Sequence, residues 1–309
     1  MLDMMQDGFQ FTSILYPFNE KRAIKIVKSS KSYQQYQDYI NKNQIEQAEI
    51  IMPDLKIVLN CPSLKYLRIS PSEDREFDFS LLYQMPHIKS LHCQNQYGSQ
   101  AQYISDIDFS KINGLHNLSI CINRGTQNYN KVQTLKSLSI GNYKGADRNL
   151  SDLFCSPNLD TLTLNGCFVH SLNGIEKSNK MQCVYLYRNR ALTDITALRD
   201  VKNTLKALRI ENCPKIQDFS VLGELENLEL LELSGSNTLP NLNFLKSMKN
   251  LKTFVFNMNV LDGDLSPCLN LSYVYSEKNR KHYNLKDAEL PKGEYIRGNE
   301  NIEEWRRLE

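Results

Sequence analysis

Apolar residues recur along most of the chain in the spacing L-x-x-L-x-L-x-x-N/C, with other apolar residues at some of the leucine positions. The clearest copies are LDTLTLNGC from Leu159, MQCVYLYRN from Met181, LKALRIENC from Leu205 and LKTFVFNMN from Leu251. Further copies begin at Leu64, Ile88, Leu115, Leu135, Leu228 and Leu271, and a degenerate one begins at Ile45. The mean spacing is about 23 residues, which predicts a solenoid with one strand in each repeat.

The central x-L-x-L-x of each copy predicts a short strand whose two apolar side chains point inward and whose x side chains point outward. Successive strands are expected to pair in parallel, about 4.8 Å apart. The ninth position is expected to turn inward, where asparagine can satisfy backbone groups of the bend and cysteine fills space. This predicts a ladder that consists of Asn123, Asn189, Asn259, Asn279, Cys167 and Cys213.

The segments LTDITALRDVKNTLKALRIENC from Leu192 and IQDFSVLGELENLELLEL from Ile216 resemble the short repeat of internalin-type bacterial proteins. From about Ile45 to Asn279 the chain resembles the leucine-rich repeat family. The resemblance implies an α/β fold: a solenoid with a curved parallel β-sheet on its concave side and short helices, 3-10 turns and loops on its convex side. Cysteine-rich end caps and the exported N-terminus of internalins are missing from the sequence, so their cell-surface role is not expected here.

The two ends do not follow the repeat and are expected to cover the terminal repeats, whose cores would otherwise be exposed. Residues 1–44 are predicted to form an N-terminal cap with a strand from Ala23 and a helix from Tyr33. Residues 45–283 form the predicted solenoid of about 10–11 repeats. Residues 284–309 are predicted to form a capping tail with a short helix, in which Trp305 packs against either the last repeat or a partner.

Outward positions of the predicted strands change in character along the chain, from small and polar in the middle to aromatic and charged in the C-terminal half. Tyrosine and arginine are enriched at binding hot spots, because they combine a large contact area with a polar group. The predicted main contact cluster is Tyr185, Tyr187, Arg209, Glu211, Glu232, Tyr273 and Tyr275. A second, N-terminal anchor is predicted at Tyr66, Arg68 and His92. Alternatively, Arg209 and Glu232 merely pair with each other, and partners bind at edges, loops or the convex side.

Composition limits the function classes. The chain has 37 Lys+Arg against 35 Asp+Glu, without the basic surplus of a nucleic-acid or anionic-membrane binder. No apolar run is long enough for a membrane span and no secretion signal is recognisable, so a cytoplasmic protein is expected. The cysteines are far apart without a C-x-x-C pair, so we expect buried free thiols rather than disulfides or a metal site. They are Cys61, Cys93, Cys121, Cys155, Cys167, Cys183, Cys213 and Cys268.

No common catalytic or phosphate-binding motif is present, and the five histidines lack ligand-type spacing. The adjacent His92 and Cys93 are expected to point to opposite faces of a strand, which disfavours a nucleophile pair. We therefore expect no enzyme activity, no catalytic residue and no cofactor. The sequence favours a bacterial inhibitor or immunity-type protein that binds a toxin or enzyme. The alternative is an effector or adaptor that acts in a host cell; an enzyme with an unrecognised site is a third, weaker hypothesis.

Overall fold

The computed structural model describes residues 4–13, 22–27, 31–51, 54–70, 78–93, 106–153 and 156–295. These residues belong to two units, the first of which ends at Leu138 and the second of which begins at Ser139. Both units consist of repeats in which a strand is followed by a loop or a 3-10 turn. No helix in the described ranges has both the length and the apolar character that crossing a bilayer requires.

The first unit has a sheet with the strand order β1-β2-β3-β4-β5-β6-β8. Its strands are β1 (Met4–Gln6), β2 (Phe9–Ser13), β3 (Arg22–Ile26), β4 (Gln47–Ile50), β5 (Tyr66–Ile69), β6 (Ser90–Cys93) and β8 (Asn117–Cys121). The pairs β1–β2 and β2–β3 are antiparallel, and every later pair is parallel. A separate two-stranded parallel ladder consists of β7 (Ile107–Asp108) and β9 (Thr126–Gln127). The turns and the helix are α1 (Tyr33–Lys42), η1 (Leu55–Val58), η2 (Phe79–Gln84), η3 (Phe109–Lys111) and η4 (Tyr129–Lys131).

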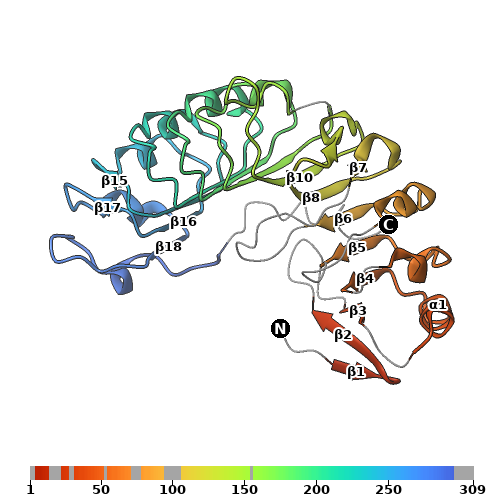
Figure 1. Cartoon of the computed structure of the whole chain (residues 1–309). Helices are drawn as coiled ribbons and strands as arrows, with labels where there is room; N and C mark the ends of the chain where they lie inside the picture. Colours follow the sequence, from red (N-terminus) through yellow and green to blue (C-terminus); the bar gives the residue numbers. More distant parts are fainter. Residues whose placement is uncertain are drawn as a thin grey trace. The chain divides into compact units, whose positions relative to one another are not determined.

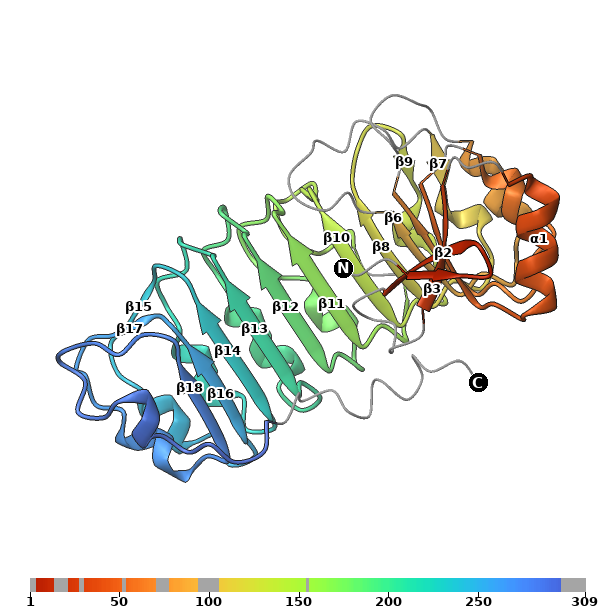
Figure 2. The same cartoon turned by 90° about the horizontal axis from the view of Figure 1, so that it is seen from below.

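The second unit has a parallel sheet with the order β11-β12-β13-β14-β16-β18, preceded by β10, which spans the boundary between the units. Figure 2 shows these strands side by side. They are β10 (Ser137–Gly141), β11 (Thr161–Asn165), β12 (Cys183–Tyr187), β13 (Ala207–Glu211), β14 (Leu230–Ser234), β16 (Thr253–Phe256) and β18 (Tyr273–Ser276). The strands β15 (Thr238–Leu239) and β17 (Asn259–Val260) form a short ladder of their own.

Short 3-10 turns lie on the other, convex side of this second sheet, so its strands line the concave side (Figure 1). They are η5 (Ile175–Lys177), η6 (Thr196–Val201), η7 (Ser220–Glu224), η8 (Asn243–Lys246) and η9 (Ser266–Asn270). The turn η10 (Asp287–Glu289) follows β18 in the chain. The predicted leucine-rich repeat solenoid is confirmed.

Strand alternation produces the core of each repeat. In β13, Leu208 and Ile210 are buried and Arg209 between them is half-buried. In β14, Leu231 and Leu233 are buried and Glu232 is half-buried. The two apolar positions of the motif therefore face inward, as the period of two requires.

The convex-side turns η6 and η7 begin at an aspartate that accepts a hydrogen bond from the backbone two residues later. Asp194 Oδ1 accepts from Thr196 N at 2.8 Å, and Asp218 Oδ1 accepts from Ser220 N at 2.8 Å. Hydrogen bonds to the backbone and side chain of Ser220 hold the pKa of Asp218 below its usual value. Aspartate accepts such bonds readily, which is why LTDIT from Leu192 and IQDFS from Ile216 each start a turn here.

The ninth motif position forms an inward ladder over part of the chain. Asn189 is fully buried, and Cys167 and Cys213 are buried as predicted. Asn189 Oδ1 accepts from Cys167 N at 2.8 Å, and its Nδ2 donates to Leu164 O at 3.0 Å, so one side chain connects two repeats. The prediction is wrong for Asn279, which is exposed, because its Oδ1 accepts from Asp287 N in the loop after β18 instead of turning inward.

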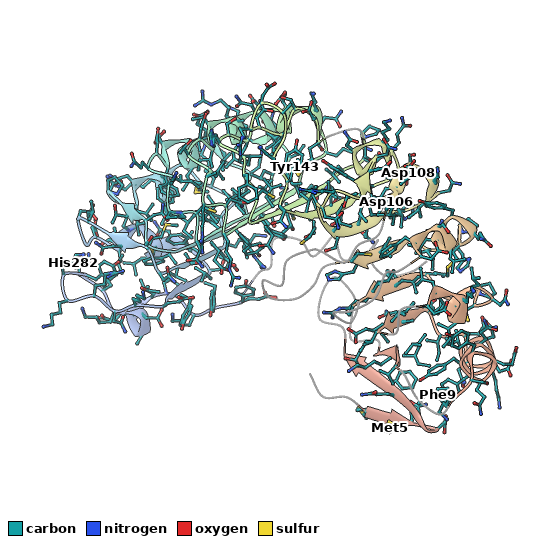
Figure 3. The ribbon with its side chains drawn as sticks, viewed as in Figure 1. Met5, Phe9, Asp106, Asp108, Tyr143 and His282 are labelled. Carbon is teal, nitrogen blue, oxygen red and sulfur yellow. The ribbon has the colours of Figure 1, made fainter. Side chains whose placement is uncertain are left out.

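The N-terminal strand and helix lie where the sequence predicts them, as β3 and α1. Ser32 and Gln35 form a capping box at the start of α1: Ser32 N donates to Gln35 Oε1 at 2.7 Å, and Gln35 N donates to Ser32 Oγ at 3.3 Å. Phe9 of β2, labelled in Figure 3, stacks on Tyr39 of α1 with ring centroids 3.9 Å apart. The predicted helix around Trp305 lies outside the described residues.

Candidate functional site

Parallel register brings the predicted C-terminal residues together on the concave face. Tyr185, Arg209 and Glu232 are direct neighbours on β12, β13 and β14. The row continues through Val255 of β16 to Tyr275 of β18. A second row places Tyr187 beside Glu211, and Tyr273 lies next to Thr253 on the strand before it.

Arg209 is the centre of this arrangement. Its Nε lies 3.1 Å from Glu232 Oε2, and its guanidinium carbon lies 5.1 Å from the centre of the Tyr185 ring. Burial by itself would lower the pKa of Arg209, but the carboxylate of Glu232 and the neighbouring tyrosines raise it by more. The guanidinium is therefore held in place by an ion pair on one side and a cation–π contact on the other.

Six residues of the predicted main contact cluster retain solvent exposure, and we call them the tyrosine–arginine surface. They are Tyr187, Arg209, Glu211, Glu232, Tyr273 and Tyr275. Tyr275 is the most exposed of the tyrosines among them, at 42% of its full surface. Tyr185 is buried under this surface, so it supports Arg209 rather than offering contact area of its own.

The third motif position is buried in most repeats, which corrects the expectation that it is exposed. Thr161, Cys183, Ala207, Leu230 and Thr253 occupy this position on consecutive strands, and all are buried. Of the third, fifth and seventh positions of these repeats, only the fifth and the seventh include partly exposed side chains.

The predicted N-terminal anchor offers little surface, because Tyr66 and Arg68 are buried and His92 is only half-buried. Arg68 Nε lies 3.3 Å from Glu49 Oε1, with side chains that are 7% and 9% exposed. Burial, and then the charge of Arg68, lowers the pKa of His92 to about 4, so the imidazole is neutral at physiological pH. Burial raises the pKa of Tyr66 to about 12, with a smaller effect from Glu46. These contacts make Arg68 part of a buried ion pair.

Sequence reasoning missed several residues that contact the predicted sites, among them Glu49, Lys292 and Tyr295. Glu49 is the fifth residue of the degenerate repeat from Ile45, and β4 pairs it directly with Arg68. Including the fifth position of this degenerate repeat among the outward positions would have identified Glu49. Tyr295 contacts Glu232 from 63 residues further along the chain, and no periodicity points to it.

Cysteine and histidine chemistry is not concentrated at either place. Seven cysteines are free thiols in the part of the chain that the structure describes; six are buried and Cys121 is half-buried. Burial raises the pKa of Cys61 to about 11 and that of Cys268 to about 12, with a smaller effect from Asp264 on Cys268. A buried thiol with a raised pKa is a poor nucleophile. Within the described ranges no three His, Cys, Asp or Glu side chains are grouped so that they could hold a metal ion.

No protein-family profile matches the sequence, and no curated protein matches it. Among solved structures, the chain is similar to an internalin, InlF, of Listeria monocytogenes, at 18% sequence identity and a TM-score of 0.55. This match covers 82% of the chain and 73% of the internalin. InlJ of the same bacterium gives 14% identity and a TM-score of 0.49, over 74% of this chain and 48% of that one. A leucine-rich repeat protein of Leptospira interrogans gives 13% sequence identity and a TM-score of 0.40, over 83% of this chain and 82% of that one.

The InlF match and the repeat geometry together define the fold class: the chain has the leucine-rich repeat fold. The similarity in fold to InlF agrees with the resemblance to internalin-type repeats drawn from the segments at Leu192 and Ile216. At this level of identity the likeness describes the fold.

Proposed function

We propose that the protein is a non-catalytic protein-binding module and that it binds its partner through the tyrosine–arginine surface. The observation that carries this proposal is the grouping of partly exposed tyrosine, arginine and glutamate side chains on neighbouring strands from β12 to β18. Large side chains with polar ends are the usual hot-spot residues of protein interfaces. Leucine-rich repeat solenoids commonly present such residues on a concave face.

Preorganisation supports the same proposal. Arg209 is held by Glu232 and Tyr185, so a partner does not have to order this long side chain on binding. Immobilising a flexible side chain costs about 0.5–1.5 kcal/mol on association. A surface that is already ordered avoids that cost, which favours tight binding and suits a blocking function.

For the biological role we propose a bacterial cytosolic inhibitor or immunity-type protein that blocks a toxin or an enzyme. The free, buried cysteines suit a reducing compartment. The fold is similar to that of a bacterial protein, InlF. The alternative role, an effector or adaptor in a host cell, uses the same surface on a different partner.

Affinity purification of the tagged chain from its native cell, with mass spectrometry, distinguishes the two roles. The inhibitor proposal predicts one stoichiometric partner from that cell, whose activity falls when the two are mixed. Recovery of a partner only after transfer into another cell would contradict the inhibitor role and support the effector.

Replacing Tyr187 and Arg209 together by alanine is expected to weaken partner binding at least about tenfold, as loss of central hot-spot residues does. The measurement is isothermal titration calorimetry with the purified partner. The matched control replaces Phe168, an exposed aromatic residue in the turn after β11, and Arg199, which pairs with Glu224 at 2.9 Å at the convex side. The control is expected to bind like the unmodified chain. Equal affinities of both double variants would show that this surface is not the binding site.

A further inference from the structure

The tyrosine–arginine surface already holds a tyrosine side chain from elsewhere in the chain. The Tyr295 hydroxyl donates a hydrogen bond to Glu232 Oε1 at 2.7 Å. Its ring packs edge-on against Tyr273, with centroids 5.3 Å apart and planes at 90°. Glu232 is on β14 and Tyr273 is on β18, with β16 between them. Tyr295 therefore bridges over the concave face.

Backbone pairing positions this tyrosine. Val274 N donates to Pro291 O at 2.9 Å, and Gly293 N donates to Ser272 O at 3.0 Å, so the segment runs antiparallel along β18. A Cβ on Gly293 would lie 2.8 Å from Ser272 O, so glycine permits the close approach. The segment is fixed up to Gly293, and Tyr295 extends from this fixed point onto the sheet.

Lys292 strengthens the attachment from the opposite side. Its Nζ donates to Val274 O at 2.7 Å and lies 2.6 Å from Asp287 Oδ1. The same ammonium lies 5.9 Å from the ring centre of Tyr273 and 5.5 Å from that of Tyr275. These contacts hold the two tyrosines of β18 in place. One of them, Tyr273, together with Glu232 forms the site that the Tyr295 side chain occupies, which we call the seat.

Glu232 uses its two oxygens for different donors. Oε2 faces Arg209, and Oε1 accepts from the Tyr295 hydroxyl. The seat therefore selects an aromatic ring that carries a hydroxyl donor, and its carboxylate would repel a phosphate at the same place. Tyr295 itself remains 37% exposed, so it can leave the seat without opening the core.

We propose that the tyrosine–arginine surface recognises a tyrosine-bearing segment of its protein partner and that Tyr295 occupies this seat in the unbound chain. This inference rests on the proposed function and gives the partner a chemical requirement: an accessible tyrosine with an unmodified hydroxyl. Binding then exchanges one tyrosine for another, and the internal tyrosine lowers the apparent affinity for the partner.

The test uses the full chain and a capped synthetic peptide, Glu-Tyr-Ile-Arg-Gly, which reproduces residues 294–298. Binding is followed by saturation-transfer NMR up to about 5 mM peptide, since a tethered side chain has an effective concentration in the millimolar range. Tyr295→Ala vacates the seat and is expected to bind the peptide at least about fivefold more tightly than the unmodified chain.

Specificity for a tyrosine hydroxyl is tested in the Tyr295→Ala variant, in which the seat is empty. Peptides with phenylalanine or phosphotyrosine in place of tyrosine are expected to bind about tenfold more weakly, because the hydrogen bond to a charged acceptor is lost or replaced by repulsion. Adding Glu232→Gln is expected to weaken the tyrosine peptide similarly. The matched control is Tyr33→Ala: Tyr33 is 38% exposed and donates to Asp54 Oδ2 at 2.8 Å, far from this sheet in sequence.

Tyr33→Ala should bind the peptide like the unmodified chain. Absence of saturable binding to Tyr295→Ala, or equal binding of the tyrosine and phenylalanine peptides, would overturn the inference. The proposed function would survive that result if Tyr187 and Arg209 still determine affinity for the natural partner. If the peptide test fails and Tyr187 and Arg209 also have no effect on affinity for the natural partner, the proposed function is contradicted as well.

Discussion

Replacing Asn189 by alanine is expected to lower the free energy of unfolding by about 3 kcal/mol, because two buried backbone groups lose their partners at once. The side chain is 0% exposed. Its amide accepts from Cys167 N and donates to Leu164 O, and both bonds cross from one repeat to the previous one. Urea denaturation followed by circular dichroism measures the change.

The matched control occupies the same motif position in the last repeat. Asn279 is exposed and its Oδ1 accepts from Asp287 N at 2.7 Å, where water can replace it. Asn279→Ala is therefore expected to cost less than about 1 kcal/mol. If the two substitutions had equal effects, the inward ladder would not be what holds neighbouring repeats together at this position.

Replacing Arg68 by alanine is expected to cost about 3 kcal/mol, because it leaves the carboxylate of Glu49 buried without its counter-charge. Among the described residues, Glu49 then keeps a hydrogen bond from Ser70 Oγ, at 3.2 Å. The same urea measurement applies. Arg68 was a candidate binding residue, and this result would instead identify its main contribution as structural.

A double variant distinguishes the electrostatic contribution of the ion pair from the packing contribution of its two side chains. Glu49→Leu with Arg68→Met removes both charges and is expected to remain within about 1–2 kcal/mol of the unmodified chain, since apolar replacement of a buried pair is often neutral. A loss below about 1 kcal/mol for Arg68→Ala would contradict the assignment, because the Glu49 carboxylate would then be solvated.

The repeat made the fold predictable from sequence. Alternation over x-L-x-L-x determines which side chains face inward, and equal spacing determines register, so Arg209 beside Glu232 followed from counting alone. Exposure did not follow from counting. Ala207 and Arg209 point to the same face of β13, yet the first is buried and the second is half-buried, since the short alanine side chain stays close to the sheet and the long arginine side chain extends away from it.

Only the part of the candidate site that is built from consecutive repeats was predictable from the sequence. The row from Tyr185 to Tyr275 is built from consecutive repeats, whereas Tyr295 reaches Glu232 from an irregular segment after the last strand. A periodic pattern carries no information about where an aperiodic segment returns. The exposed position of Asn279 has the same origin, since the loop after β18 leads to η10 rather than to another repeat.

Hydroxyl-radical footprinting of the complex with the purified natural partner tests the central claim most directly. Tyr275 on the concave face is 42% exposed, and Leu269 on convex-side η9 is 49% exposed, so both are reactive in the free chain. Binding through the tyrosine–arginine surface predicts that Tyr275 and Tyr187 become protected while Leu269 and Phe168 react as before. Protection of Leu269 or Phe168 with Tyr275 and Tyr187 unchanged would contradict the account.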